Sequence, residues 1–265
     1  MSHPDAGRRV GDVVLDVRDI SLAFGGVKAL TDISFDVREH EIRAIIGPNG
    51  AGKSSMLNCI NGVYQPQQGS IALRGRTFAR MNSRQVAEMG VARTFQNLAL
   101  FPGLSVLENI KLGAHAQLRA NFGTAALYLG PAKREEDDLT RRIDDGLLDA
   151  LDLRAIRDQP VSGLPYGVQK RIELARSMVT RPRLLLLDEP AAGMNAAEKK
   201  AMSGYIRLCM TQWGATVLTI DHDMEMIMGL SDHVVVLNFG RVIATGTPAA
   251  VQRNPAVIDA YLGAA

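Results

Sequence analysis

The sequence predicts an α/β fold with a mostly parallel core sheet, an N-terminal antiparallel β subdomain and an inserted helical subdomain. One apolar run, residues 42–46, breaks into a glycine-rich loop that opens a helix. A second run, residues 184–187, consists of four leucines and ends in two carboxylates. Because continuous apolar runs of strand length are typical of strands buried on both faces, both runs predict parallel strands in the core of the sheet.

Length and composition limit the organisation and the partners. A chain of 265 residues favours one large domain, 13–265, behind a flexible N-terminus at 1–12. Apolar residues make up 46% and charged residues 22%, as in an ordinary globular protein. The net charge of +2 indicates no basic tail, so we expect no nucleic-acid partner.

Targeting signals and cysteine usage point to the cytoplasm. The apolar runs are far shorter than the roughly 18 to 20 residues that cross a bilayer. No apolar segment follows Arg8 and Arg9, as a secretory signal requires. Cys59 and Cys209 lack C-x-x-C spacing, which favours two reduced thiols, with Cys59 in the core.

The loop after the first apolar run carries the pattern G-x-x-x-x-G-K-[ST], which predicts a P-loop NTPase that binds Mg-nucleotide. Its glycines let backbone N–H groups converge on a polyphosphate at the positive end of the helix. Lys53 would reach the β and γ phosphates, and Ser54 would offer its hydroxyl to magnesium. A glycine-rich turn with a solvated lysine is the minor alternative. The predicted phosphate-binding residues are Gly47, Pro48, Asn49, Gly50, Ala51, Gly52, Lys53, Ser54 and Ser55.

The N-terminal third indicates antiparallel strands around this loop. Residues 13–20 and 33–37 are expected to be strands, and the second alternates apolar and polar side chains. A turn at Phe24-Gly25-Gly26 places an aromatic ring upstream of the phosphate loop, where packing and ligand contact are equally good explanations. A short strand at 70–73 and a hairpin at 74–76 follow.

The middle of the chain predicts the helical insertion, at 97 to about 178. Gln96 is expected at the end of a strand over 91–95, where an open α/β sheet faces its ligand, although a lone glutamine is commonly a solvated loop residue. Capping boxes at 82–85 and 105–108 begin helices, the second running to about Leu118. The apolar residues within 120–131 either pack internally or form a docking surface. One amphipathic helix face carries Ile143, Leu147, Leu148 and Leu151.

The remaining chemistry-bearing residues also follow apolar strands. Asp188 comes after the leucine run, where a carboxylate can hold magnesium together with Ser54, and Glu189 could take a proton from the attacking water. His222 follows a strand at 216–220, which raises the chance that it meets the γ-phosphate or that water. A capping box at 195–198 opens a helix to about Trp213. A hairpin near Gly240 and an N-cap at Thr247-Pro248 complete the chain.

The order of these motifs resembles the ATP-binding cassette of ABC transporters over nearly the whole chain from residue 13. The succession is GPNGAGKS, Gln96, LPYGVQKR, LLLLDEP and Asp221-His222. The resemblance implies that Phe24 stacks on adenine and that Gln96 senses magnesium and water. It implies metal binding by Asp188, catalysis by Glu189 and a switch role for His222. It makes the segment Leu164, Pro165, Tyr166 and Gly167 a signature that caps the γ-phosphate of a second subunit.

Finer features are similar to the ATPase subunits of branched-chain amino acid importers. These features are the LPYG form, the segment DEPAAGMN and the C-terminal GRVIATGTP. The resemblance implies a homodimer or paralogous heterodimer, separate integral membrane permeases, and indirect work with an extracytoplasmic substrate-binding protein. The ATPase would lie at the inner face of the membrane. Pro165, Val168, Asn195, Ala196 and His40 depart from common cassette patterns and affect the expected dimer contacts.

Two alternatives belong to other functional classes. A non-transport cassette acting on DNA or ribosomes would carry a long coiled-coil insertion or a second cassette, and neither is present in the sequence. A P-loop GTPase or small-molecule kinase predicts an N-K-x-D motif or a nucleoside lid, and the sequence has no N-K-x-D. Transport is therefore the preferred interpretation. The sequence does not identify the cargo, because a cassette contacts nucleotide and permease and never the transported molecule.

Overall fold

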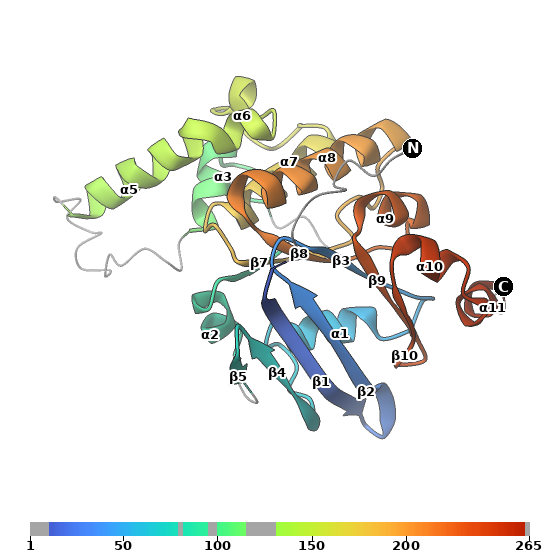
Figure 1. Ribbon diagram of the computed structural model, residues 1–265. Coiled ribbons are helices and arrows are strands. Elements are labelled where there is room, and N and C mark those ends of the chain that lie inside the picture. Colours follow the sequence, from blue (N-terminus) through green and yellow to red (C-terminus); the bar gives the residue numbers. More distant parts are fainter. Residues whose placement is uncertain (1–10, 79–81, 95–99, 115–130, 263–265) are drawn as a thin grey trace.

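The computed structural model describes residues 11–78, 82–94, 100–114 and 131–262. The core is a six-stranded sheet in the order β10-β9-β3-β8-β7-β6, with a separate four-stranded sheet in the order β2-β1-β4-β5 (Figure 1). Strands β9, β3, β8, β7 and β6 run parallel, and β10 pairs antiparallel with β9 at the edge. The predicted α/β class with a mostly parallel core is confirmed.

The strands of the core sheet are short and mostly buried. Every residue of β3, β7 and β8 is buried, which explains why apolar side chains predominate in these strands. Their bounds are β3 (Ile42–Ile46), β6 (Val91–Arg93), β7 (Leu184–Asp188), β8 (Thr216–Ile220), β9 (His233–Asn238) and β10 (Arg241–Gly246).

The antiparallel sheet is built on a long hairpin. Strands β1 (Val13–Phe24) and β2 (Val27–Arg38) turn at Gly25 and Gly26, so both are longer than the predicted strands at 13–20 and 33–37. The cause is the pairing of Phe24 with Val27, which continues the ladder to the two-residue glycine turn. Strands β4 (Gln68–Leu73) and β5 (Arg76–Phe78) complete the sheet.

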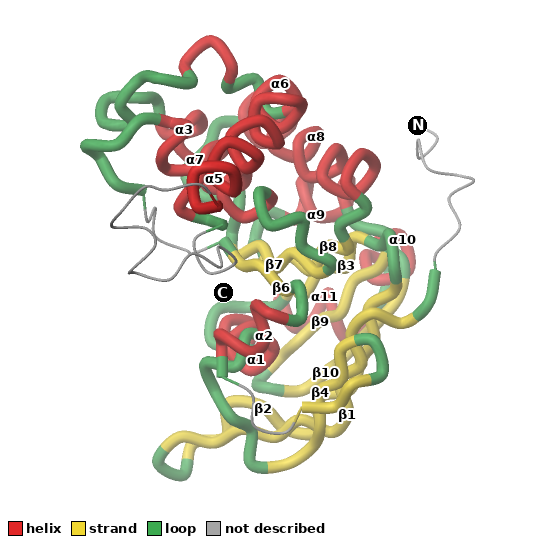
Figure 2. Tube along the Cα trace, turned by 90° about the vertical axis from the view of Figure 1, so that its left-hand side faces the viewer, coloured by secondary structure: helices red, strands yellow, loops and turns green. Residues whose placement is uncertain are grey.

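Helices cover both faces of the core sheet, as the two views agree (Figures 1 and 2). One face, with Leu185, Leu187 and Val217, packs on α3, α7 and α8. The other face, with Leu184, Leu186 and Leu218, packs on α1 and the antiparallel sheet. The bounds of the helices are α1 (Lys53–Ile60), α2 (Ser83–Glu88), α3 (Val106–Leu112), α7 (Tyr166–Met178), α8 (Ala196–Trp213), α9 (Met224–Leu230), α10 (Pro248–Gln252) and α11 (Pro255–Leu262).

Helix starts follow the predicted capping chemistry. The side chains of Asn82, Ser105 and Asn195 each accept a hydrogen bond from the backbone N–H three residues on. The side chain of that third residue in turn accepts a hydrogen bond from the backbone N–H of the capping residue. Thr247 caps α10, with Pro248 in its first turn. Helix α3 ends at Leu112, earlier than the predicted end near Leu118, a position outside the described residues.

Beyond α3, the chain continues as α5 (Pro131–Arg142), a π-helical turn η1 (Ile143–Leu147), α6 (Leu148–Ala150) and a 3-10 turn η2 (Arg154–Ile156). The four leucine and isoleucine side chains predicted to share a face are all buried. The prediction of one regular helix there was wrong, because Asp145 and Gly146 have non-helical backbone angles. The helical path is therefore kinked at this point.

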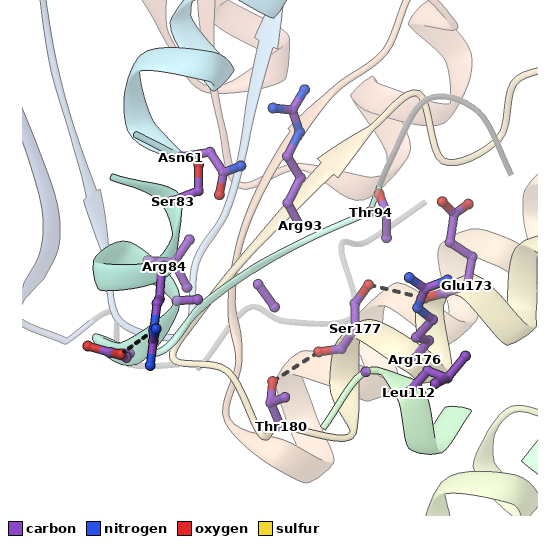
Figure 3. Close-up of a pocket in the computed structure, with 15 residues that line it drawn as sticks. Asn61, Ser83, Arg84, Arg93, Thr94, Leu112, Glu173, Arg176, Ser177 and Thr180 are labelled. Carbon is purple, nitrogen blue, oxygen red and sulfur yellow. Dashed lines mark hydrogen bonds and ion pairs between the residues drawn. The ribbon is translucent and has the colours of Figure 1, made fainter. Parts of the chain in front are cut away.

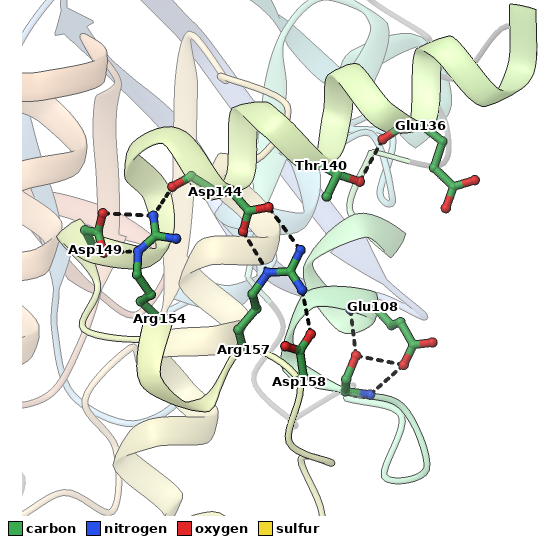
Figure 4. Close-up of polar contacts among 9 residues, drawn as sticks. Glu108, Glu136, Thr140, Asp144, Asp149, Arg154, Arg157 and Asp158 are labelled. Atoms are coloured by element: carbon green, nitrogen blue, oxygen red, sulfur yellow. Dashed lines mark hydrogen bonds and ion pairs between the residues drawn. The ribbon is translucent and has the colours of Figure 1, made fainter.

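Ion pairs fix the kinked segment to the chain that follows it (Figure 4). The Arg157 guanidinium donates to both carboxylate oxygens of Asp144, at 2.8 and 3.0 Å. Arg154 pairs with Asp149 and also donates to the Asp144 carbonyl. A fork-shaped pair of this kind restricts both partners more than a single contact would.

Two further observations concern the cysteines and the membrane. Cys59 and Cys209 are free and buried, as predicted for reduced thiols, and burial raises the pKa of each thiol to about 12. Among the residues that the structure describes, no helix combines the length and hydropathy that crossing a bilayer takes.

Candidate functional site

The loop between β3 and α1 is held against its neighbours so closely that two positions require glycine. Gly47 has φ of +152°, and a Cβ there would lie 2.1 Å from the carbonyl oxygen of Leu237 on β9. Gly52, the N-cap of α1 with φ of +98°, would bring a Cβ within 2.7 Å of the Ala29 carbonyl oxygen on β2. The loop is thus wedged between strands of both sheets, at the N-terminus of α1.

Lys53 lies inside this loop. Its ammonium donates to the carbonyl oxygens of Gly47, at 2.7 Å, and Pro48, at 3.0 Å. Burial lowers the pKa of Lys53, and the negative charge of Glu189 acts in the opposite direction. The lysine ammonium therefore lies against the loop backbone, an arrangement that suits a polyanion, and the Glu189 carboxylate is near enough for its charge to act on Lys53.

Asp188 is the last residue of β7 and is almost fully buried. One oxygen, Oδ2, accepts a hydrogen bond of 2.7 Å from Arg93, while the other, Oδ1, is buried without a hydrogen-bond partner. Parallel pairing places Asp188 beside Ile220 of β8. Because β3 pairs with β8 as Ile45 with Ile220, the phosphate loop begins at the same side of the sheet as Asp188, at the carboxyl ends of the parallel strands.

Glu189 adopts a left-handed backbone conformation, with φ of +48°. For a non-glycine residue this costs on the order of 1–3 kcal/mol, and such strain concentrates at functional sites. The peptide N–H of Glu189 donates to the Ile220 carbonyl at 2.9 Å, which fixes the turn to β8. The carboxylate is about three-quarters buried and lies 3.6 Å from Nδ1 of His222.

His222 is held through its backbone and leaves its ring exposed. The buried carboxylate of Asp221 accepts hydrogen bonds from the peptide N–H groups of His222, at 2.8 Å, and Asp223, at 3.0 Å. Asp223 then caps α9 and pairs with Lys199 of α8 at 2.5 Å. The structure therefore brings together four of the predicted site residues at the carboxyl ends of the parallel strands. They are Lys53, Asp188, Glu189 and His222.

Phe24 stands at the end of β1, in the hairpin turn. The residue is 46% exposed, and its ring meets that of Tyr64 edge-on, with ring centroids 5.0 Å apart. One part of the ring is therefore packed and the other is open, so the packing and ligand-contact explanations both describe the same side chain.

The segment 164–167 lies at the start of α7 and contacts the chain after β7. Pro165 is the N-cap of α7, and its carbonyl accepts hydrogen bonds from the N–H groups of Val168 and Gln169. A Cβ on Gly167 would lie 2.8 Å from Glu198, and one on Gly193 would lie 3.4 Å from the Tyr166 ring. This segment therefore rests on residues 193–198, whereas the phosphate loop rests on β2 and β9.

A cavity of about 360 Å³ lies between α2, β6, α3 and α7 (Figure 3). Arg93 and Thr94 line it together with Ser177 of α7 and Thr180 in the turn that follows that helix. Gln96, predicted to sense magnesium and water, lies outside the described residues, as do Phe95 and Leu98. The strand before it, predicted over 91–95, is described as β6 and ends at Arg93.

Sequence reasoning missed two residues that hold the predicted site residues in place. Arg93 contacts Asp188, and Asp221 organises the backbone around His222. An arginine closing an apolar strand, in VAR, was an available signal for the first. The second was visible only as the acid before His222, because its contacts with peptide N–H groups depend on the turn.

The residues present fit a magnesium ion. The observation that supports this is the buried, unpartnered Oδ1 of Asp188. Magnesium takes oxygen ligands, commonly one or two carboxylates together with substrate phosphates. The Ser54 hydroxyl, in the first turn of α1, supplies a second oxygen of the required type.

Comparisons with known proteins identify the family. Residues 30–192 match a family described as ABC transporter, and residues 241–265 match one described as branched-chain amino acid ATP-binding cassette transporter. The chain belongs to the ABC transporter family. It is an ABC-type ATPase, and its ligand is a nucleotide.

The relatives of this ATPase align over almost its full length. A high-affinity branched-chain amino acid transport ATP-binding protein of Pseudomonas aeruginosa is 40% identical over 252 residues, covering 95% of this chain and 98% of that protein. A protein of the same description from Escherichia coli strain K12 is 39% identical with the same coverage. A solved ADP-bound ATP-binding cassette of an ABC transporter aligns with a TM-score of 0.82 and 27% identity, covering 95% of this chain and 99% of that one. The resemblance seen in the sequence is confirmed.

Proposed function

We propose that this ATPase energises the import of branched-chain or related hydrophobic amino acids through separate membrane permeases. The observation that supports the cargo is the 40% identity, along 95% of the chain, with a relative whose name specifies high-affinity branched-chain amino acid transport. The observation that supports hydrolysis is the placement of Glu189 beside His222, one residue after the buried Asp188.

At each site, the phosphate loop and Lys53 bind the nucleotide, and Phe24 contacts its adenine. Ser54, Asp188 and Gln96 would hold a magnesium ion, which would supply positive charge to offset the negative charge of the phosphates. Glu189 accepts a proton from the attacking water, and its carboxylate is within reach of the His222 ring, which orients the water and the γ-phosphate. The strained turn at Glu189 holds the base toward the phosphates.

We infer that the complete site needs a second ATPase subunit, in a homodimer or a paralogous heterodimer. The support is that residues 164–167 rest on 193–198 and the phosphate loop rests on other strands. No side chain caps α7, so the N–H groups of Tyr166 and Gly167 in its first turn would be available to an anion. With proline at 165, these two N–H groups and the segment from Leu164 would cap the partner's γ-phosphate.

The permease contact is assigned to the helical insertion, 97 to about 178. Among its described apolar residues, Phe101 is 53% exposed, while Leu100 and Leu104 are half-buried. The side-chain amide of Asn109 accepts a hydrogen bond from the N–H of Phe101, at 2.8 Å, and donates one to its carbonyl oxygen, at 3.1 Å. The backbone that carries this exposed ring is therefore held in place. Leu98 and the apolar residues of 122–129 complete the assignment. The ATPase then works at the inner face of the membrane, and an extracytoplasmic binding protein meets only the permease.

The test is uptake of radiolabelled leucine, isoleucine and valine by a deletion strain. Wild type should restore uptake, and Phe101→Asp should not, although its ATPase activity in isolation stays close to normal. Ile258→Asp, which changes a 42% exposed residue on α11, is the matched control and should restore transport. Full transport with Phe101→Asp would contradict the docking assignment.

The cargo and the alternative function have their own outcomes in the same strain. If no amino-acid or organic-acid flux changes on deletion, the importer assignment fails. A loss of DNA repair or translation without a change in uptake would instead support a non-transport cassette that acts on nucleic acid or ribosomes.

A further inference from the structure

Arg93 makes an ion pair that the proposed site does not yet use. It ends β6, and its side chain is 10% exposed. One guanidinium nitrogen lies 2.7 Å from Oδ2 of Asp188, and another donates to Oδ1 of Asn58 at 2.6 Å. In the close-up, the guanidinium points away from Ser177 and Arg176 on α7, although Arg93 also lines the cavity in front of that helix (Figure 3).

The two ends of this bridge lie on the two elements that carry the proposed magnesium ligands. Asn58 lies four residues after Ser54 on α1, so both side chains are on the same face of that helix. Asp188 ends β7. The guanidinium of Arg93 therefore connects α1 to β7, the two elements that carry Ser54 and Asp188.

The geometry at Asp188 separates its two oxygens. Arg93 holds Oδ2, and Oδ1 is buried without a partner. A buried carboxylate without a compensating cation is costly, and the Arg93 guanidinium supplies that cation to Asp188. Because the guanidinium is a rigid fork, it can bond Asn58 and Asp188 together and so fix the carboxylate plane, whereas a lysine ammonium would supply the charge without this planar fork.

We propose that Arg93 is a positioning residue for the magnesium-nucleotide site. It holds Asp188 through Oδ2 so that Oδ1 is presented to the metal, and it sets the spacing between Asp188 and α1. This inference rests on the proposed magnesium site. A simpler role, neutralising a buried charge, predicts that lysine replaces Arg93 fully; a competing role, repelling the metal, predicts tighter metal binding when Arg93 is removed.

The test measures metal affinity directly, with Mn²⁺ as the probe. Electron paramagnetic resonance gives the dissociation constant of Mn²⁺ from the ADP complex, and calorimetry in EDTA gives the affinity for ADP alone. Arg93→Met should weaken Mn²⁺ binding about 10- to 100-fold, the range seen when residues that orient metal ligands are removed. The affinity for metal-free ADP should stay within about twofold, because no contact to the nucleotide is lost. Arg93→Lys should recover only part of the Mn²⁺ affinity.

The control is Arg84→Met, which removes an arginine on the rim of the same cavity whose side chain is 85% exposed and pairs with Glu88. It should leave both affinities unchanged. Wild-type or tighter Mn²⁺ binding by Arg93→Met, or complete recovery in Arg93→Lys, would overturn the proposal.

Two further outcomes keep the result interpretable. If Arg93→Met does not fold, Asn58→Ala frees one end of the bridge while leaving the ion pair with Asp188, and it should weaken Mn²⁺ binding several-fold; unchanged binding contradicts the bridge. If the wild-type chain binds Mn²⁺ no better with ADP than without it, the magnesium site itself fails, whatever Arg93 does.

Discussion

Replacing Gly47 by alanine should destabilise the protein in two ways, through a steric clash with β9 and through backbone strain in the phosphate loop. A Cβ at this position would lie 2.1 Å from the Leu237 carbonyl oxygen, whereas carbon and oxygen normally approach to roughly 3.3 Å. The loop and β9 must therefore part by about 1 Å, and the backbone angle adds strain. We expect the free energy of unfolding to fall by about 2–5 kcal/mol.

The matched variant is Gly50→Ala in the same loop. Gly50 also has a positive φ, of +79°, but an added Cβ meets nothing within 4 Å. Its cost should be the conformational strain alone, about 1–2 kcal/mol. Urea unfolding of both variants measures the difference, and a fluorescent ATP analogue should show lost binding for Gly47→Ala. An equal loss of stability in the two variants would refute the wedged-loop description.

Three further predictions concern charge. Lys53→Ala should weaken ATP binding by about 2–3 kcal/mol, roughly 30- to 150-fold by titration calorimetry, with an unchanged circular dichroism spectrum; near-normal affinity would remove Lys53 from the site. Asp144→Asn should cost about 1 kcal/mol in urea unfolding at neutral pH. Because the bond from Arg157 lowers the pKa of Asp144, this difference should be complete above about pH 4 and vanish as pH falls through the folded pKa; a pH-independent difference would contradict the pairing. Glu189→Gln should form an ATP-dependent dimer in size-exclusion chromatography, and an ATP-insensitive monomer would argue against shared sites.

The strands that build the site were predictable because burial on both faces leaves a direct mark on a sequence. The runs at 42–46 and 184–187 became β3 and β7 with the expected bounds, apart from the inclusion of Asp188. Capping boxes at Asn82, Ser105 and Asn195 were equally readable, since each depends on residues only three positions apart.

Features that depend on tertiary contacts were not predictable. The bridge from Arg93 to Asn58 joins residues 35 positions apart, and its bond to Asp188 joins residues 95 positions apart. No local pattern marks either pairing. The kink at Gly146 was also missed, because the apolar spacing around it suits a regular helix and a lone glycine does not say which way the backbone turns.

The left-handed conformation of Glu189 could be predicted from the sequence only in part. The following proline disfavours a right-handed helical backbone at Glu189, which the sequence does show. The positive φ itself depends on the bond from its N–H to Ile220 on the neighbouring strand. The strained backbone at Glu189 thus requires the assembled sheet and cannot be predicted from the motif alone.

Phosphate release by the purified ATPase is the most direct measurement of the proposed chemistry. With saturating ATP and magnesium, the wild-type chain should turn over, and Glu189→Gln should slow release by about 10²- to 10⁴-fold while still binding ATP. Glu225→Gln, which neutralises an exposed acid on α9, should behave as wild type. Turnover by Glu189→Gln at the rate of the Glu225→Gln control would contradict the account.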